Sequence, residues 1–274
     1  MSKPTFSLLF ILFIAFEGFS QGTPTDYLPA DFHKERRDAV REKLPPNTAI
    51  VLFANAERNR ANDVDYVYHQ APNFYYLTGY KEPNAVLVIF SEEQTDASGN
   101  SFDEIFYVQE RDARAEQWTG KRLGVEGVKK QLGLDMVYNG SEFENFPLDF
   151  TSFDNVTFVD FQNDYRDKPG KADLFDLIKT FKIKANYPSD YNPTRNSLYK
   201  RIATANAENS NEVTETIERY MERYPELQED EILNDFVSAN NDEIRDEIKN
   251  KVLVIQRSTN LDSSILPKVM AELR

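Results

Sequence analysis

Few residues in this chain could carry out chemistry. It has two histidines, His33 and His69, and no cysteine among its 274 residues. The absence of cysteine excludes disulfides, a thiolate nucleophile and a Cys-based zinc site, and two histidines cannot form a His-rich metal centre. A Ser-His-Asp triad would have to use one of the two histidines. The sequence therefore offers no catalytic residue and no metal ligand that we can assign.

The two histidines lie in different sequence contexts. His33 falls within a charged helical pattern, which predicts a surface position. His69 precedes Gln70 in a distinctive aromatic segment. No nucleophile partner is evident for it, so a hydrogen-bonded structural role is favoured over a catalytic one.

A pair of aspartates, Asp63 and Asp65, has a spacing that could suit a divalent cation. The segment lacks the glycine and the terminal glutamate of an EF-hand loop. Short acidic pairs of this kind more often accept backbone N–H groups in turns, and that interpretation is favoured.

Charge excludes one class of partner and marks one segment. The net charge of −14 argues against nucleic acid, because phosphate binding needs clustered Lys and Arg. Residues 206–250 hold 14 acidic and 4 basic residues, which accounts for −10 of that total. Their apolar positions keep a helical spacing. Solvated helix faces are therefore favoured over a cation-binding or partner-binding surface.

The first twenty residues are predicted to be a cleaved secretory signal. Lys3 precedes an apolar run of 11 residues, and the small residues Gly18 and Ser20 stand before Gln21. A transmembrane anchor is less favoured, because spanning hydrocarbon takes roughly 20 apolar residues. We expect an exported protein, periplasmic or extracellular, with no membrane association after cleavage.

The remaining pattern predicts a mixed α/β layer structure, because early strands are followed by interleaved helices. Strands are expected over residues 48–54, 74–77, 85–90, 104–109, 136–138 and 156–161, the third and fourth as a hairpin. Helices are expected over residues 29–44, 126–132 and 171–182, over a segment capped by Asn209 or Ser210 and ended by Pro225, and over residues 244–255.

Two ordered motifs carry a family resemblance. Residues 68–83 read YHQAPNFYYLTGYKEP, and residues 111–124 read RDARAEQWTGKRLG. Together they resemble the N-terminal domain of Xaa-Pro aminopeptidases (aminopeptidase P), in the creatinase/prolidase superfamily. The resemblance covers about residues 27–160. It implies a ribonuclease-H-like mixed sheet flanked by helices.

The same resemblance implies a function divided between two domains. In the family, two aspartates, a histidine and two glutamates hold two metal ions, commonly manganese, on a separate C-terminal domain of pita-bread fold. The ions activate a water that attacks the bond between an N-terminal residue and proline. This chain would then be the non-catalytic N-terminal domain, with that catalytic domain, peptide substrates and further copies of itself as partners.

The expected organisation has three parts. Residues 1–20 form the signal, 21–195 the aminopeptidase P N-terminal domain, and 196–274 an acidic helical extension leading towards the catalytic domain. The sequence stops within a helical pattern, which favours a fragment or a truncated gene product. The alternative is a self-standing binding protein that keeps the fold without peptidase activity.

Three residues are candidates for substrate access or for an interface. Trp118 is the only tryptophan. As a lone tryptophan it suits a packing anchor, whereas the resemblance implies that it helps to wall the substrate pocket of a neighbouring subunit. His69 and Tyr75 belong to the first motif. The run 74–76 that contains Tyr75 is predicted, by itself, to be a core strand.

Overall fold

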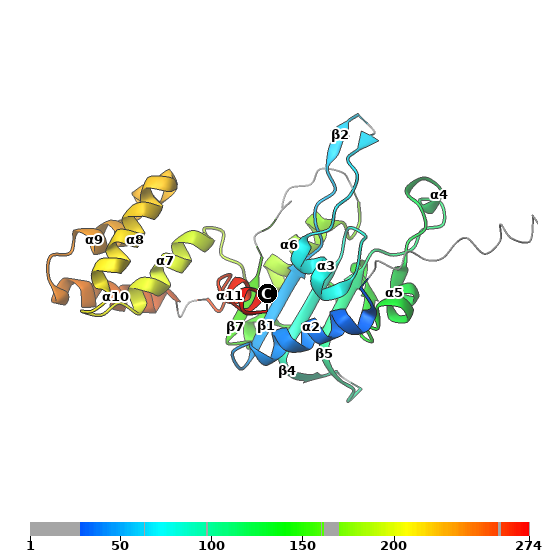
Figure 1. Cartoon of the computed structure of the whole chain (residues 1–274), viewed down its shortest axis with the longest axis horizontal. Helices are drawn as coiled ribbons and strands as arrows, with labels where there is room; N and C mark the ends of the chain where they lie inside the picture. The colour runs from blue at the N-terminus through cyan, green and yellow to red at the C-terminus, as the bar shows by residue number, and fades with distance from the viewer. Residues whose placement is uncertain are drawn as a thin grey trace, which may run out of the picture.

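A five-stranded mixed sheet forms the centre of the fold, with the strand order β6-β5-β4-β1-β7. The computed structural model describes residues 28–273 apart from 63, 97, 160, 162–169 and 257–258, so the predicted signal and Asp63 lie outside it. Figure 1 shows the arrangement of the elements. The strands are β1 (Thr48–Phe53), β4 (Val86–Thr95), β5 (Ser101–Val108), β6 (Val137–Asn139) and β7 (Asn155–Phe158).

Strand β4 runs antiparallel to β1 and β5, whereas β7 is parallel to β1 and β6 is parallel to β5. All strands except β4 therefore point the same way. The carboxyl ends of β1 and β5 consequently lie on the same side of the sheet, at the ends of its strands. This side is called here the sheet edge, and the segments that follow β1 and β5 leave from it.

Helices cover both faces of the sheet. Every residue of β1 is buried, as its continuous apolar run predicts for a strand covered on two sides. One face packs on α6 (Leu174–Lys184), and the other on α2 (Ala30–Glu42), α3 (Pro72–Thr78), α5 (Gly124–Leu132) and α11 (Ile265–Glu272). The expected α/β class, a mixed sheet flanked by helices, is confirmed.

The strand expected over residues 74–77 is wrong, because this segment is helix α3. Pro72 occupies its first turn, and Gly79 ends it with a left-handed φ of 69°. Phe74, Leu77 and Thr78 are buried. Proline at the start and glycine after the end are helix-boundary signals, and here they override the strand preference of the aromatic run.

The helical segment that follows α6 has its own hydrophobic cluster. It consists of α7 (Pro193–Ala203), α8 (Ser210–Arg223), the short 3₁₀ turn Pro225–Glu229, α9 (Glu231–Ser238) and α10 (Asp242–Gln256). Figure 1 shows these helices to one side of the sheet. The expected helical extension is confirmed. None of the helices in the described ranges is long and apolar enough to cross a bilayer.

After these helices the chain returns to the sheet. Leu261 forms a parallel bridge with Val156 of β7, and α11 packs into the sheet's core. Asn196 Nδ2 donates to the Leu261 carbonyl at 3.4 Å, and Lys200 forms an ion pair with Asp262. The boundary expected at residue 195 stays a prediction, but residues 259–273 pack with the sheet.

Candidate functional site: two arms at one edge of the sheet

Two segments extend from the sheet edge where β1 and β5 end. The first, called here the β2–β3 arm, comprises residues 57–62 and 64–67 and contains the hairpin of β2 (Asn59–Ala61) and β3 (Val64–Asp65). The second, the α4 arm, comprises residues 111–122 and contains α4 (Glu116–Thr119). Figure 1 shows β2 and α4 standing clear of the sheet on the same side.

Trp118 lies in the α4 arm and is 88% exposed. A packing anchor would be buried, so that interpretation is wrong for this chain. Exposing so large an apolar ring to water is unfavourable unless another surface covers it. The exposure is what an interface residue requires.

The other motif residues of the α4 arm hold it together. Arg111 donates from Nε and Nη2 to the two carboxylate oxygens of Glu116, each at 2.8 Å. Such bidentate pairs fix geometry as well as contributing energy. Arg111 is also the main cause that lowers the pKa of Glu116 to about 2, so the pair stays charged over the physiological range.

Backbone positions complete the α4 arm. Asp112 Oδ1 accepts the N–H groups of Arg114 and Ala115 at 2.8 and 3.2 Å, which stabilises the turn that leads into α4. Gly120 in the arm and Gly124, the first residue of α5, have φ of 83° and 59°. A Cβ on Gly124 would lie 2.6 Å from Arg111 Cγ, so this glycine makes room for the ion pair.

The β2–β3 arm carries exposed apolar side chains that sequence reasoning missed. Val64, Tyr66 and Val67 are 52%, 60% and 81% exposed. They are the large apolar residues of a segment otherwise rich in Arg, Asn and Asp, and none of the described residues of this segment is buried. That local contrast is the signal that could have found them.

His69 and Tyr75 have different surroundings from Trp118. His69 is exposed, and its carbonyl accepts Asn55 Nδ2 at 2.8 Å. Tyr75 is half-buried on α3, where its ring meets the His33 ring edge-on at 5.6 Å and Lys81 Nζ lies 5.7 Å from its centroid. An interface role for either residue stays a prediction.

His33 does not lie on the surface as predicted, because only 1% of it is exposed. His33, Arg37 and Val40 form the buried face of α2, a spacing of four and three residues that marks one side of a helix. His33 Nδ1 lies 2.8 Å from the Tyr76 carbonyl, and Arg37 Nη1 donates to the Leu77 carbonyl at 2.8 Å. Both side chains therefore satisfy carbonyl groups at the end of α3.

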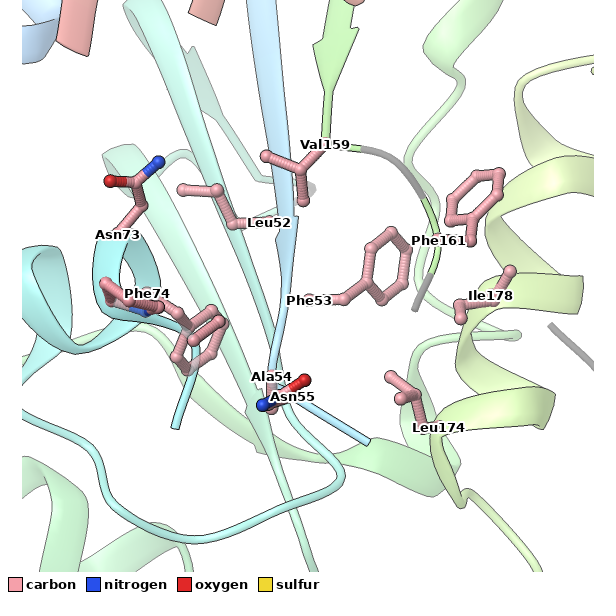
Figure 2. Close-up of a pocket in the computed structure, with 12 residues that line it drawn as sticks. Leu52, Phe53, Ala54, Asn55, Asn73, Phe74, Val159, Phe161, Leu174 and Ile178 are labelled. Carbon is pink, nitrogen blue, oxygen red and sulfur yellow. The ribbon is translucent and has the colours of Figure 1, made fainter. Parts of the chain in front are cut away.

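A cavity of about 340 Å³ opens at the end of β1, between α3 and α6. Figure 2 shows Phe53 and Phe161 between β1 and α6. Leu52, Phe74 and Ile178 add further apolar surface, and Asn55 and Asn73 add amides. None of the described residues that line it has an ionisable side chain, so these residues can contact an apolar group but supply no acid or base.

Within the described ranges, no group of three or more His, Asp or Glu side chains could hold a metal ion. These residues therefore do not fit the metal centre that the family resemblance implies for its catalytic domain. We assign no chemical step to them.

Comparison with known proteins finds a family domain that part of this chain resembles. Residues 33–154 match the family model described as "Aminopeptidase P, N-terminal domain". The chain is 39% identical over 116 residues to Xaa-Pro aminopeptidase of Haemophilus influenzae, covering 42% of this chain and 26% of that protein. Residues 33–154 are thus similar to the N-terminal domain of the aminopeptidase P family.

Other relatives of the aminopeptidase P domain match in the same way. Xaa-Pro aminopeptidase of Escherichia coli is 37% identical over 109 residues, covering 40% of this chain and 24% of that protein. Intermediate cleaving peptidase 55 of Schizosaccharomyces pombe is 34% identical over 158 residues, covering 58% of this chain and 32% of that protein. The match thus spans about a quarter to a third of the length of these relatives.

Among solved structures, Escherichia coli aminopeptidase P with the inhibitor Pro-Leu matches at 29% identity and a TM-score of 0.46. That match covers 59% of this chain and 34% of the other.

Proposed function

We propose that this chain is the non-catalytic N-terminal part of an exported Xaa-Pro aminopeptidase, a manganese-dependent enzyme that removes an N-terminal residue preceding proline. The match of residues 33–154 and the names of the relatives support this proposal. Catalysis would belong to a C-terminal pita-bread domain that supplies the metal ligands. The part described here would contribute to oligomerisation and substrate access.

The observation that carries the contact role is Trp118, which is 88% exposed on an arm whose other motif residues hold it in place. The β2–β3 arm extends to the same side and carries exposed Tyr66 and Val67. Aromatic side chains displayed in this way are typical interface anchors. We assign Trp118 to the wall of a substrate pocket in a neighbouring subunit.

The test is Trp118→Ala in an enzyme that joins this chain to its catalytic domain. Loss of an interface contact should leave melting temperature and metal content unchanged and lower kcat/KM for longer peptides by roughly 10-fold or more, as loss of an interface anchor does. Tyr220→Ala, which truncates an aromatic side chain on α8 that is 37% exposed, is the matched control. Unchanged kinetics with Trp118→Ala would refute the pocket role.

A second experiment separates the proposal from a self-standing binding protein. The chain alone should release no first residue from Xaa-Pro peptides with added Mn²⁺, because its described residues do not form a metal site. Turnover that persists through purification would refute a non-catalytic role. If the reading frame continues into a sequence with the family's metal ligands, the self-standing alternative is removed.

The proposed export is tested through the N-terminus of the mature protein. Mass spectrometry of the exported protein should find an N-terminus at or near Gln21, because the short apolar run is followed by Gly18 and Ser20. An intact N-terminal segment in the membrane fraction would count against cleavage.

A further inference from the structure

Hydrogen bonds through Gln70 and Glu82 connect the bases of the two arms. Gln70 Nε2 donates to the Glu82 carbonyl at 3.0 Å, which joins the two residues. The connection from the β2–β3 arm through Gln70 and Glu82 to the α4 arm is called here the Gln70–Glu82 bridge.

Gln70 forms the half of the bridge at the β2–β3 arm. Its Oε1 accepts the N–H groups of Asn55 and Ala71 at 2.8 and 3.0 Å and the Tyr68 hydroxyl at 3.0 Å. Asn55 precedes this arm and Tyr68 follows it, so a single side-chain oxygen contacts both ends of the arm.

Glu82 forms the half at the α4 arm. Its Oε1 accepts the Leu123 N–H at 2.9 Å, immediately after that arm, and its Oε2 accepts the hydroxyl of buried Tyr80 at 3.0 Å. Tyr80 lies in the core of the sheet domain, so Glu82 connects the arm to the buried core of the fold.

Neither arm has enough packing of its own to stay in place. Every described residue of β2 and β3 is exposed, and α4 has four residues, none of them buried. Isolated two-stranded hairpins and single helical turns are marginal in water. Their orientation must therefore be set by contacts at their bases.

We infer that Gln70 and Glu82 are positioning residues that hold the β2–β3 arm and the α4 arm in a fixed relation, so that both present one contact surface. What the contact surface is used for rests on the proposed function. The positioning itself concerns this chain alone and needs no catalytic domain to be measured.

The single tryptophan makes the α4 arm directly observable. A chain labelled with ¹⁵N-tryptophan gives one backbone amide signal, from Trp118. Its order parameter should be near 0.85, the usual value for rigid backbone, and Glu82→Met should lower it to below about 0.6. Methionine has a similar length but cannot accept the Leu123 and Tyr80 hydrogen bonds.

Three variants separate positioning from general stability. Glu82→Gln keeps an oxygen for the Leu123 N–H and can donate its amide to the Tyr80 hydroxyl, so it should restore the wild-type order parameter. Tyr80→Phe keeps the Leu123 bond and should leave Trp118 rigid. Glu126→Gln removes one charge from an exposed position on nearby α5 and should also have no effect. A Trp118 amide equally rigid in Glu82→Met and wild type would overturn the inference.

The β2–β3 arm is measured with a second probe. Tyr66→Trp adds one tryptophan signal in that arm, and Gln70→Ala in this background should lower its order parameter from about 0.85 to below about 0.6. No change at that probe would overturn the role of Gln70.

Hydrogen exchange tests the Gln70–Glu82 bridge in the wild-type chain, so this measurement does not depend on whether a variant folds. The amides of Asn55 and Leu123 should exchange more slowly than in an unfolded chain by on the order of tenfold or more. Exchange of either amide at the unfolded rate would overturn the bridge. If Trp118→Ala does not change the peptidase kinetics, the substrate-pocket role of this surface is refuted. The positioning role of Gln70 and Glu82 would still be decided by the order parameters and the exchange rates.

Discussion

The imidazole of His33 occupies the space that a side chain on Gly79 would need: a Cβ there would lie 2.8 Å from both His33 Cδ2 and Nε2. Gly79 also has a φ of 69°, in the left-handed region. The glycine of the first motif therefore serves two purposes. It ends α3, and it lets α2 approach closely enough for His33 to contact the Tyr76 carbonyl.

Gly79→Ala should accordingly be strongly destabilising. The left-handed conformation alone costs about 1–2 kcal/mol for a residue with a Cβ, and the contact with His33 adds to it. Gly99→Ala is the control, because Gly99 has a φ of 85° with no atom within 4 Å of the added Cβ. Urea unfolding should show a larger loss for Gly79→Ala, and a loss equal to that of Gly99→Ala would contradict the steric argument.

His33 should make the stability of the sheet domain depend on pH. Burial, as the main cause, lowers the pKa of His33 below its ordinary value of 6.5. The unfolded chain therefore binds this proton more readily, so the contribution is fully present above about pH 6.5 and is lost as pH falls below it. Unfolding free energies from pH 8 to 5 should show a decline that His33→Gln reduces and His69→Gln, at the exposed histidine, does not. An unchanged slope in His33→Gln would refute the assignment.

Arg37 and Glu104 connect α2 to β5 through a pair whose arginine is completely buried. Arg37 Nε and Nη2 donate to Glu104 at 2.7 and 3.0 Å. Arg37→Met should cost about 3 kcal/mol, because it leaves a carboxylate without its main partner. Combining it with Glu104→Met should recover part of that loss. Lys34→Met, at an exposed pair with Asp38, should change the unfolding free energy by less than about 0.5 kcal/mol.

The helical segment should unfold separately from the sheet. Its hydrophobic cluster contains fully buried Leu233 and shares no residue with the two clusters of the sheet. Leu233→Ala should therefore cost about 2–5 kcal/mol locally. Hydrogen exchange should accelerate in α8 to α10 while β1 stays protected. Equal acceleration in β1 would show that the two parts unfold together.

Sequence patterns predicted most of this fold because they reflect burial. The apolar run of β1 and the spacing of α8 follow directly from covered surfaces. The pattern failed at α3, where aromatic residues favour a strand and only the flanking proline and glycine indicate a helix. It also failed at His33, whose charged neighbours concealed the buried face of α2.

The candidate site was harder to predict, because its motif residues contact groups distant in sequence. Gln70 and Glu82 were visible as motif members, but the pairing of Glu82 with the Leu123 N–H spans 41 positions and depends on the sheet. The exposure of Trp118 could not be predicted from the sequence either. A lone tryptophan among charged and small residues suits either a core or an interface, and only the fold distinguishes them.

The return of α11 to the sheet affects the order in which the protein can fold during synthesis. Leu266, Val269 and Met270 belong to the same core as strand β1, yet the ribosome makes them after all of the helices α7 to α10. At roughly 5–20 residues per second, the helical segment can form its local contacts while one face of the sheet still lacks its last helix. The nascent sheet therefore exposes apolar surface for seconds, the interval in which a chaperone would be most useful to it.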